Sequence, residues 1–255
     1  MTSSATRWTL LVDVLLVGAV AYAALSGSTG VLAALIPFSG CLVFWQILVF
    51  VRARRGNLTL GVERNIKLPH YFQTGVQTCH YLYLGIYYPA VWFHLPLIAI
   101  QVVVFYAIEM LLQWSRGKNW RAGFGPLPVV GSINLFLWFE PEHFFGQLLL
   151  VVGALVSREF VRWRSGGQSS HIFNPSAIVL AAAGVFLMAT DTTTATTGIN
   201  HILAFELPPS FFELMFVFGI LLQIFFATTL VTFGAVLALA AIHYGGTLLL
   251  GISPL

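Results

Sequence analysis

The stretch 171–177, His-Ile-Phe-Asn-Pro-Ser-Ala, contains residues whose types and order suit chemistry. Asn174 is a good N-cap, and Pro175 suits the first turn of a helix because proline has no N–H group to donate. A capped helix start explains these residues. They are explained equally by a helix N-terminus that faces a buried anionic group, such as the phosphate of a cofactor. In that second interpretation, Asn174, Pro175 and Ser176 bind the cofactor.

A threonine-rich stretch, 191–197, follows the next apolar segment and reads Asp-Thr-Thr-Thr-Ala-Thr-Thr. Its five hydroxyl groups and one carboxylate offer partners for a phosphate-bearing cofactor, with Asp191, Thr194 and Thr197 as the candidate residues. The same groups suit helix caps, a cation site or a solvated loop. The sequence leaves these alternatives open.

His80 lies within an apolar stretch and is the best candidate for an axial ligand of a haem or chlorophyll. The chain has no Cys-x-x-Cys-His attachment signature, and no two histidines share a helix at ligand spacing. A histidine packed in the core is the simpler interpretation. We identify no metal site and no catalytic residues in the sequence, so it leaves open whether the protein is an enzyme.

Two acidic residues, Asp13 and Glu109, also interrupt apolar stretches. Charges inside hydrocarbon are costly and are often functional. We therefore predict that Asp13 and Glu109 belong to a proton or ion path. Arg158 and Glu213 are expected to lie near the membrane interfaces.

The amino-acid composition indicates whether water or lipid surrounds the chain. The chain has 255 residues, of which 58% are hydrophobic and 8% are charged, and its mean hydropathy is +0.87. About a quarter of the residues in a typical soluble domain are charged. The sequence therefore predicts an integral membrane protein and excludes a nucleic-acid-binding domain. Cys41 and Cys79 have no metal-ligand spacing and are expected to be buried free thiols.

Nine apolar segments must position the candidate residues, which predicts an all-α, polytopic fold with about eight or nine transmembrane helices. Segment 123–139 is rich in Gly and Pro and suits either a brief span or a broken, re-entrant helix. We expect one transmembrane domain over 1–255, with a two-helix hairpin over 1–60 and a core over 63–255. The apolar end of the sequence favours a native chain that continues beyond residue 255. The segments are 8–27, 31–51, 71–92, 95–114, 123–139, 144–163, 171–190 and two within 210–250.

The positive charges alternate with these segments. All twelve Lys and Arg residues lie between Arg7 and Arg164. Apart from Arg7, which precedes the first segment, they lie in the links 52–67, 116–121 and 158–164, whereas the links 26–30, 92–95, 140–143 and 191–208 have none. The positive-inside rule then predicts a cytoplasmic N-terminus in a bacterial-type inner membrane, with the threonine-rich stretch outside.

Residues 122–177 resemble the core of the family that contains the D subunit of the Rnf electron-transport complex and the B subunit of the sodium-pumping NADH:quinone oxidoreductase. The sequence is most similar to the shorter RnfD-like members, the UnbU type. The resemblance is carried by the Gly- and Pro-rich stretch 122–139, by the basic stretch before His-Ile-Phe-Asn-Pro-Ser at 171–176, and by Leu-Pro-Pro at 207–209. It covers roughly 63–210.

This RnfD/NqrB-like resemblance implies an inverted-repeat helical fold and a subunit of a larger complex. Redox members attach FMN to a threonine in an Asp-x-x-Ser-Gly-Ala-Thr motif. Asp191 and Thr197 match that motif in spacing, whereas Thr194, Ala195 and Thr196 replace its Ser, Gly and Ala. Two cysteines cannot ligate an iron–sulfur cluster, so a redox role needs partner subunits.

Three hypotheses follow from the sequence. The chain is a membrane subunit linked to electron transport or ion translocation, with contact to a flavin or quinone. Alternatively, it is a non-catalytic structural or assembly subunit that has lost the cofactor, or a small-molecule carrier with a site at the broken helices. The expected partners are membrane lipid and other subunits of a membrane complex, and not nucleic acid.

Overall fold

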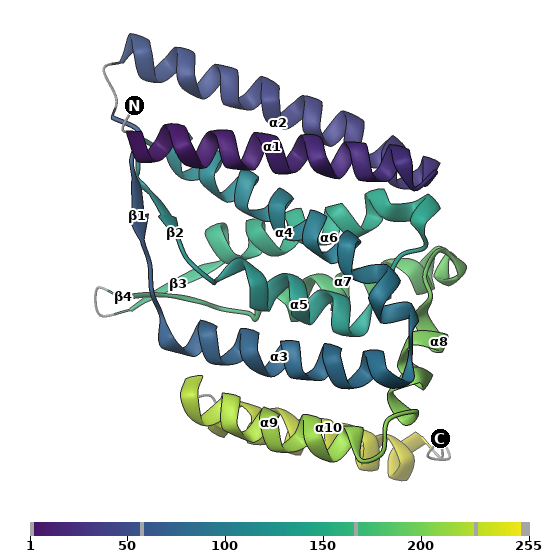
Figure 1. Ribbon diagram of the computed structural model, residues 1–255. Coiled ribbons are helices and arrows are strands. Elements are labelled where there is room, and N and C mark those ends of the chain that lie inside the picture. Colours follow the sequence, from purple (N-terminus) through teal and green to yellow (C-terminus); the bar gives the residue numbers. More distant parts are fainter. Residues whose placement is uncertain (1–2, 57–58, 166–167, 227–228, 251–255) are drawn as a thin grey trace. The chain divides into compact units, whose positions relative to one another are not determined.

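The computed structural model describes residues 3–56, 59–165, 168–226 and 229–250. The chain forms two compact units, Met1–Pro209 and Ser210–Leu255, and the described part of both is mainly helical (Figure 1). The first unit contains α1 (Ser3–Leu25), α2 (Thr29–Arg55), α3 (Leu68–Tyr87), α4 (Ala90–Ser115), α5 (Pro126–Phe136), α6 (Phe144–Phe160), α7 (Pro175–Ala189) and α8 (Gly198–Leu203). Three 3₁₀ turns, η1 (Pro141–His143), η2 (Thr193–Ala195) and η3 (Ala204–Glu206), belong to the same unit. The second unit contains α9 (Phe211–Phe226) and α10 (Thr229–Leu250). The chain end at 251–255 lies outside the described residues.

Four helical segments of the described chain are long and apolar enough to cross a membrane: α1, α2, α4 and η1 with α6. A fifth is added when Asn200–Glu206 and Phe211–Phe226 are counted as one broken span. The predicted all-α class is confirmed, and these segments fit a membrane protein. Length and composition do not support eight or nine spans. Helices α5 and α7 have 11 and 15 residues, or ~16 and ~22 Å at 1.5 Å per residue, which is less than ~30 Å of hydrocarbon.

Helix α4 forms the centre of the first unit. In its apolar window, 56% of the residues are buried inside the protein, compared with 28% for α1 and 22% for α2. Helices α1, α2, α5 and α6 all pack against α4. The N-terminal hairpin therefore shares one core with the rest of the unit, and most of its apolar surface is exposed, which is compatible with contact to lipid.

The two cysteines correct one prediction. Cys41 and Cys79 are free, as expected, but both are exposed. They lie on α2 and α3. Cysteine tends to be buried in water-soluble proteins because it is a small hydrophobe. A helix face that meets lipid gives an exposed thiol an apolar environment without burial in protein.

Two small sheets lie in links that the sequence analysis treated as polar loops. Strands β1 (Val62–Arg64) and β2 (Trp120–Ala122) pair in parallel, with Val62 opposite Trp120. Strands β3 (Arg162–Ser165) and β4 (Gln168–His171) form an antiparallel pair. The first sheet fixes the link between α2 and α3 against the link between α4 and α5.

The charged and uncharged links gather at opposite ends of the first unit (Figure 1). At one end, Arg52 Nη1 donates to the Ser115 carbonyl at 2.9 Å, and Arg116 pairs with Glu159 at 3.1 Å. At the other end, the Glu140 amide donates to the Ala195 carbonyl at 3.0 Å. The links therefore group at the two ends as the charge pattern predicted, except that 92–95, predicted as a link, lies within α4. We call the two sets the basic end (52–67, 116–121 and 158–164) and the threonine end (26–30, 138–143 and 191–197).

Candidate functional site

Three amides form a hydrogen-bonded cluster inside the first unit. Gln101 of α4, Asn134 of α5 and Gln147 of α6 are each 0% exposed. Asn134 Oδ1 accepts from Gln101 Nε2 at 3.0 Å and from Gln147 Nε2 at 3.3 Å. Asn134 Nδ2 donates back to Gln101 Oε1 at 2.7 Å. The cluster ties three helices together, and no motif in the sequence marks these three residues as partners.

Helix α3 supplies polar groups to the other side of α5. Gln77 Nε2 donates to the Pro128 carbonyl at 3.0 Å and to Ser132 Oγ at 2.8 Å. The Tyr81 hydroxyl donates to the Gly131 carbonyl at 2.7 Å. These contacts explain why α3 has a lower apolar content than α4. The Gln77 and Tyr81 side chains are buried against α5, which keeps their hydrogen-bonding groups away from lipid, where such groups are costly.

An aromatic stack lies where α5 ends. The Trp138 ring lies between His94, at 4.1 Å and 14°, and His201, at 3.9 Å and 31° between ring planes. His94 Nε2 lies 3.3 Å from Asn134 Oδ1, and His201 Nε2 lies 2.9 Å from the Leu135 carbonyl. All three rings are buried. The stack therefore connects the amide cluster to the short helix α8.

The threonine-rich stretch is tied to this stack. The Thr197 amide and hydroxyl donate to the Trp138 carbonyl at 2.9 and 3.3 Å. Thr196 forms a β-bridge with Phe139. Asp191 and Thr194 are exposed, and Asp191 has a φ of 54° in the turn that follows α7. The predicted residues of this stretch therefore divide into an anchored threonine and two that face outwards.

The second predicted group lies at the opposite end of α7. Asn174 Oδ1 accepts from the Ser176 amide at 3.1 Å and from the Ser176 hydroxyl at 2.8 Å, and Pro175 begins the helix. The capped helix start predicted from the sequence is confirmed. Fifteen helical residues separate this cap from Asp191, or ~22 Å. The structure therefore does not bring the two groups of candidate cofactor residues together.

The geometry at Thr197 bears on the FMN that the family resemblance implies. A phosphate ester forms at the threonine hydroxyl and removes its proton. That hydroxyl is partly buried here and donates to a backbone carbonyl. The residues present do not fit covalent FMN at Thr197, and we derive no chemistry through that group.

Glu109, predicted for a proton or ion path, lies in a network of charges at the basic end. It is 8% exposed and forms an ion pair with Arg158 of α6. Glu109 Oε2 also accepts from Trp120 Nε1 at 3.2 Å. Arg158 lies 3.5 Å from Glu159, which pairs in turn with Arg116. Negative and positive side chains alternate along this network, from Glu109 through Arg158 and Glu159 to Arg116.

Asp13 and His80 lie apart from that network. Asp13 Oδ2 accepts from Gln46 Nε2 at 3.0 Å, between α1 and α2. Asp13 Oδ1 is buried without a hydrogen-bond partner among the described residues. His80 is buried on α3, with 5% exposure. Within the described ranges, no three His, Cys, Asp or Glu side chains are arranged to hold a metal ion.

Comparisons of the chain with protein-family models, with curated proteins and with solved structures found no match.

Proposed function

We propose that the chain is a multi-pass subunit of a larger membrane complex, of the RnfD/NqrB-like kind, and that it takes part in electron transport or ion translocation. The observation that supports this most directly is the pairing of α5 and α7. Both helices are too short to cross a membrane, and they pack against each other within the first unit, where most of α5 is buried and α7 buries Ser176 and Leu187. Interrupted helices survive at membrane depth only when protein surrounds them, and in transport proteins they surround the functional site.

The two short helices share one polarity. Each begins at the basic end with a proline in its first turn and finishes at the threonine end. The positive ends of both helix dipoles therefore point towards the basic end. Gly153 of α6 permits the close approach of α7, because a Cβ atom there would lie 3.1 Å from Val179.

The charge network at the basic end supplies the proposed path for protons or ions. Glu109 lies six residues before the end of α4, and Arg158 lies in the last turn of α6. The alternating chain of Glu109, Arg158, Glu159 and Arg116 leads from the helix interior to the surface. In this proposal the basic end faces the cytoplasm, as the positive-inside rule favours.

A structural or assembly role is the second candidate. It is favoured by the amide cluster, in which three fully buried side chains satisfy one another. A satisfied polar core makes a structure rigid, which suits a scaffold. The occupied Thr197 hydroxyl favours this role as well, because it removes the attachment point for a flavin.

Purification of the whole complex in mild detergent distinguishes the two candidates. We expect the chain to be unmodified in mass and to travel with redox-active partner subunits. In the proposed role, Glu109→Gln lowers the coupled electron-transport or ion-uptake activity of the assembled complex, whereas Lys118→Gln, an exposed neighbour at the same end, leaves it unchanged. Normal activity in an intact Glu109→Gln complex would support the scaffold, and a chain that purifies alone would contradict both.

A further inference from the structure

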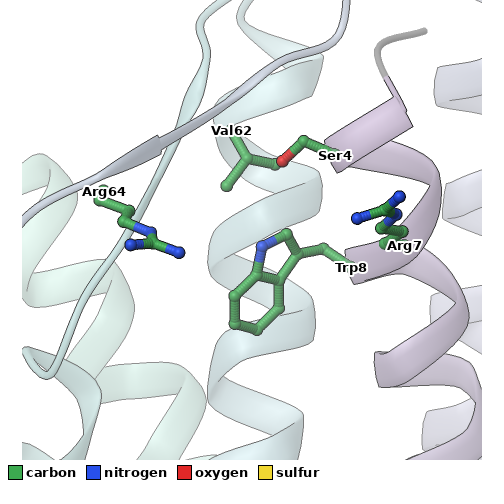
Figure 2. Close-up of a pocket in the computed structure, with 5 residues that line it drawn as sticks. All are labelled: Ser4, Arg7, Trp8, Val62 and Arg64. Carbon is green, nitrogen blue, oxygen red and sulfur yellow. The ribbon is translucent and has the colours of Figure 1, made fainter.

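An open pocket of about 300 Å³ lies between the start of α1 and strand β1. It is lined by Ser4, Arg7, Trp8, Val62 and Arg64. Figure 2 shows the guanidinium groups of Arg7 and Arg64 on either side of the Trp8 indole, with the Ser4 hydroxyl at the upper edge. None of the functions discussed above uses this pocket.

The α1 side of the pocket is anchored by aromatic packing. Trp8 is 37% exposed and meets Trp120 edge to face, with ring centroids 5.2 Å apart. Trp120 is 0% exposed, and its indole nitrogen donates to Glu109. The indole of Trp8 therefore forms one fixed side of the pocket. Ser4 and Arg7 lie in the first two turns of the same helix.

Strand geometry orients the β1 side. Alternate residues of a strand point to opposite faces, so Val62 and Arg64 face the pocket together. Glu63 points to the other face, where it accepts from Asn119 Nδ2 at 2.8 Å and lies 3.8 Å from Arg121. Pairing with β2 fixes this register. The nearest carboxylate on the strand is thereby directed away from Arg64.

The pocket has an excess of positive charge. Its lining contains two arginines and no acidic residue. Arg116, Arg121 and Arg158 each pair with a glutamate, but the structure shows no such carboxylate at Arg7 or Arg64 in the described part of the chain. The N-terminus of the 23-residue helix α1 adds the positive end of its dipole.

We propose that this pocket binds a phosphate group, and specifically the phosphodiester headgroup of an anionic phospholipid. Arginine pairs with phosphate through two parallel hydrogen bonds, and two guanidinium groups with a serine hydroxyl offer enough donors for its oxygens. A tryptophan at the end of an apolar helix lies at headgroup level. Basic pockets at helix ends on the cytoplasmic side recognise anionic headgroups in this way.

Native mass spectrometry of the full-length chain tests the site with three probes: phosphatidylglycerol, phosphatidylcholine and inorganic phosphate. The variant Arg7→Gln/Arg64→Gln removes both guanidinium groups. The matched control, Arg54→Gln/Arg55→Gln, removes two exposed arginines at the end of α2 that do not line the pocket. We expect the pocket variant to bind phosphatidylglycerol roughly thirtyfold more weakly, because it loses charge-assisted hydrogen bonds to the phosphate. The control arginines do not line the pocket, and their removal should weaken binding roughly threefold or less, because the remaining attraction is screened by salt.

Each outcome decides the proposal. Selective loss of phosphatidylglycerol, with phosphatidylcholine unaffected, supports the headgroup site. Arginine-dependent binding of inorganic phosphate at similar affinity assigns the site to free phosphate and overturns the lipid source. Equal losses in the pocket variant and the control overturn the site itself. If the double glutamine variant does not fold, Arg7→Lys/Arg64→Lys keeps the charge but loses the paired hydrogen bonds, and unchanged selectivity in that variant would also overturn the proposal.

Discussion

Removing both members of the ion pair between Glu109 and Arg158 should destabilise the protein by less than the sum of the two single removals. The side chains of Glu109 and Arg158 are only 11% and 13% exposed. A charge that loses its partner in such a place keeps the cost of its lost hydration without the compensating attraction. The two single substitutions, Glu109→Gln and Arg158→Met, and their combination therefore form an informative double-mutant cycle.

The remaining contacts set the size of each effect. Breaking a fully buried pair costs about 3–5 kcal/mol. After Glu109→Gln, Arg158 still has Glu159 at 3.5 Å, so we expect the unfolding free energy to fall by about 2 kcal/mol. After Arg158→Met, Glu109 loses its ion pair and keeps the hydrogen bond from the Trp120 N–H, so we expect the unfolding free energy to fall by about 3 kcal/mol. The double variant should lose about 3 kcal/mol, not the sum of about 5 kcal/mol, which is a coupling of about 2 kcal/mol.

Unfolding in mixed detergent micelles, followed by far-ultraviolet circular dichroism, measures these differences. Lys118→Gln is the control because Lys118 is an exposed cation at the same end of the unit, and it should change stability by about 0.5 kcal/mol or less. Additive losses in the double variant would refute the pairing argument. Unchanged stability of the Glu109→Gln protein would show that the carboxylate has no structural role. The proposed ion path would then be the remaining explanation for a buried carboxylate at this position.

Three further predictions, two of them with a matched control substitution, are tested in the first unit by the same unfolding assay. Asn134→Leu should cost about 2 kcal/mol, since several interhelical hydrogen bonds worth about 0.6 kcal/mol each are lost; unchanged stability would contradict the importance of the amide cluster. Gly30→Ala should cost about 2 kcal/mol because the added Cβ would meet the backbone of η1. The control Gly40→Ala has open space around its Cβ and should be neutral or stabilising by up to about 1 kcal/mol. Equal effects of the two substitutions would contradict the close approach of Gly30 to η1. Thr197→Ala should cost about 1 kcal/mol through its lost hydrogen bond and Thr194→Ala less than about 0.5 kcal/mol, and the reverse order would show that the loop is anchored elsewhere.

The charge pattern predicted which links lie at the same end of the first unit. Successive links alternate between the two ends, and the positive charges are found in every second link. Arg52, Arg116 and Arg158 are far apart in sequence, yet their links meet at one end. Local signals were equally informative. The cap at Asn174 depends on a contact only two residues away, with the Ser176 amide, and the structure confirms it.

Segment 123–139 shows why hydropathy alone does not fix the number of spans. Its residues are mostly apolar, with Ser132 and Asn134 as the exceptions, so its composition resembles a crossing helix. The helix begins only at Pro126, and by Leu137 the backbone is extended, with φ of −146° and ψ of 123°. Hydropathy measures the environment of a segment, whereas the point at which a helix ends depends on what its last carbonyl groups can contact.

The amide cluster could not be predicted for a related reason. Gln101, Asn134 and Gln147 are separated by 33 and 13 residues along the chain. Each is a single polar residue in an apolar helix, and the sequence does not say which of them meet. The charge network has the same property, because Glu109 and Arg158 are 49 residues apart. Pairings over such distances depend on how the helices pack.

The end of α5 shows why the amide cluster, the aromatic stack and the threonine-rich stretch belong to one structural device. A helix that stops inside an apolar unit leaves carbonyl groups that water cannot reach. His201 bonds the Leu135 carbonyl, the Trp138 indole bonds the Asn134 carbonyl, and Gln147 accepts from the Phe139 amide. His201 lies on α8, Trp138 in the segment after α5, and Gln147 on α6. Each of these side chains supplies a hydrogen bond that water would otherwise make. The loop that resembles a flavin motif is therefore held in place by the backbone chemistry of the short helix, whether or not a complex uses it for redox chemistry.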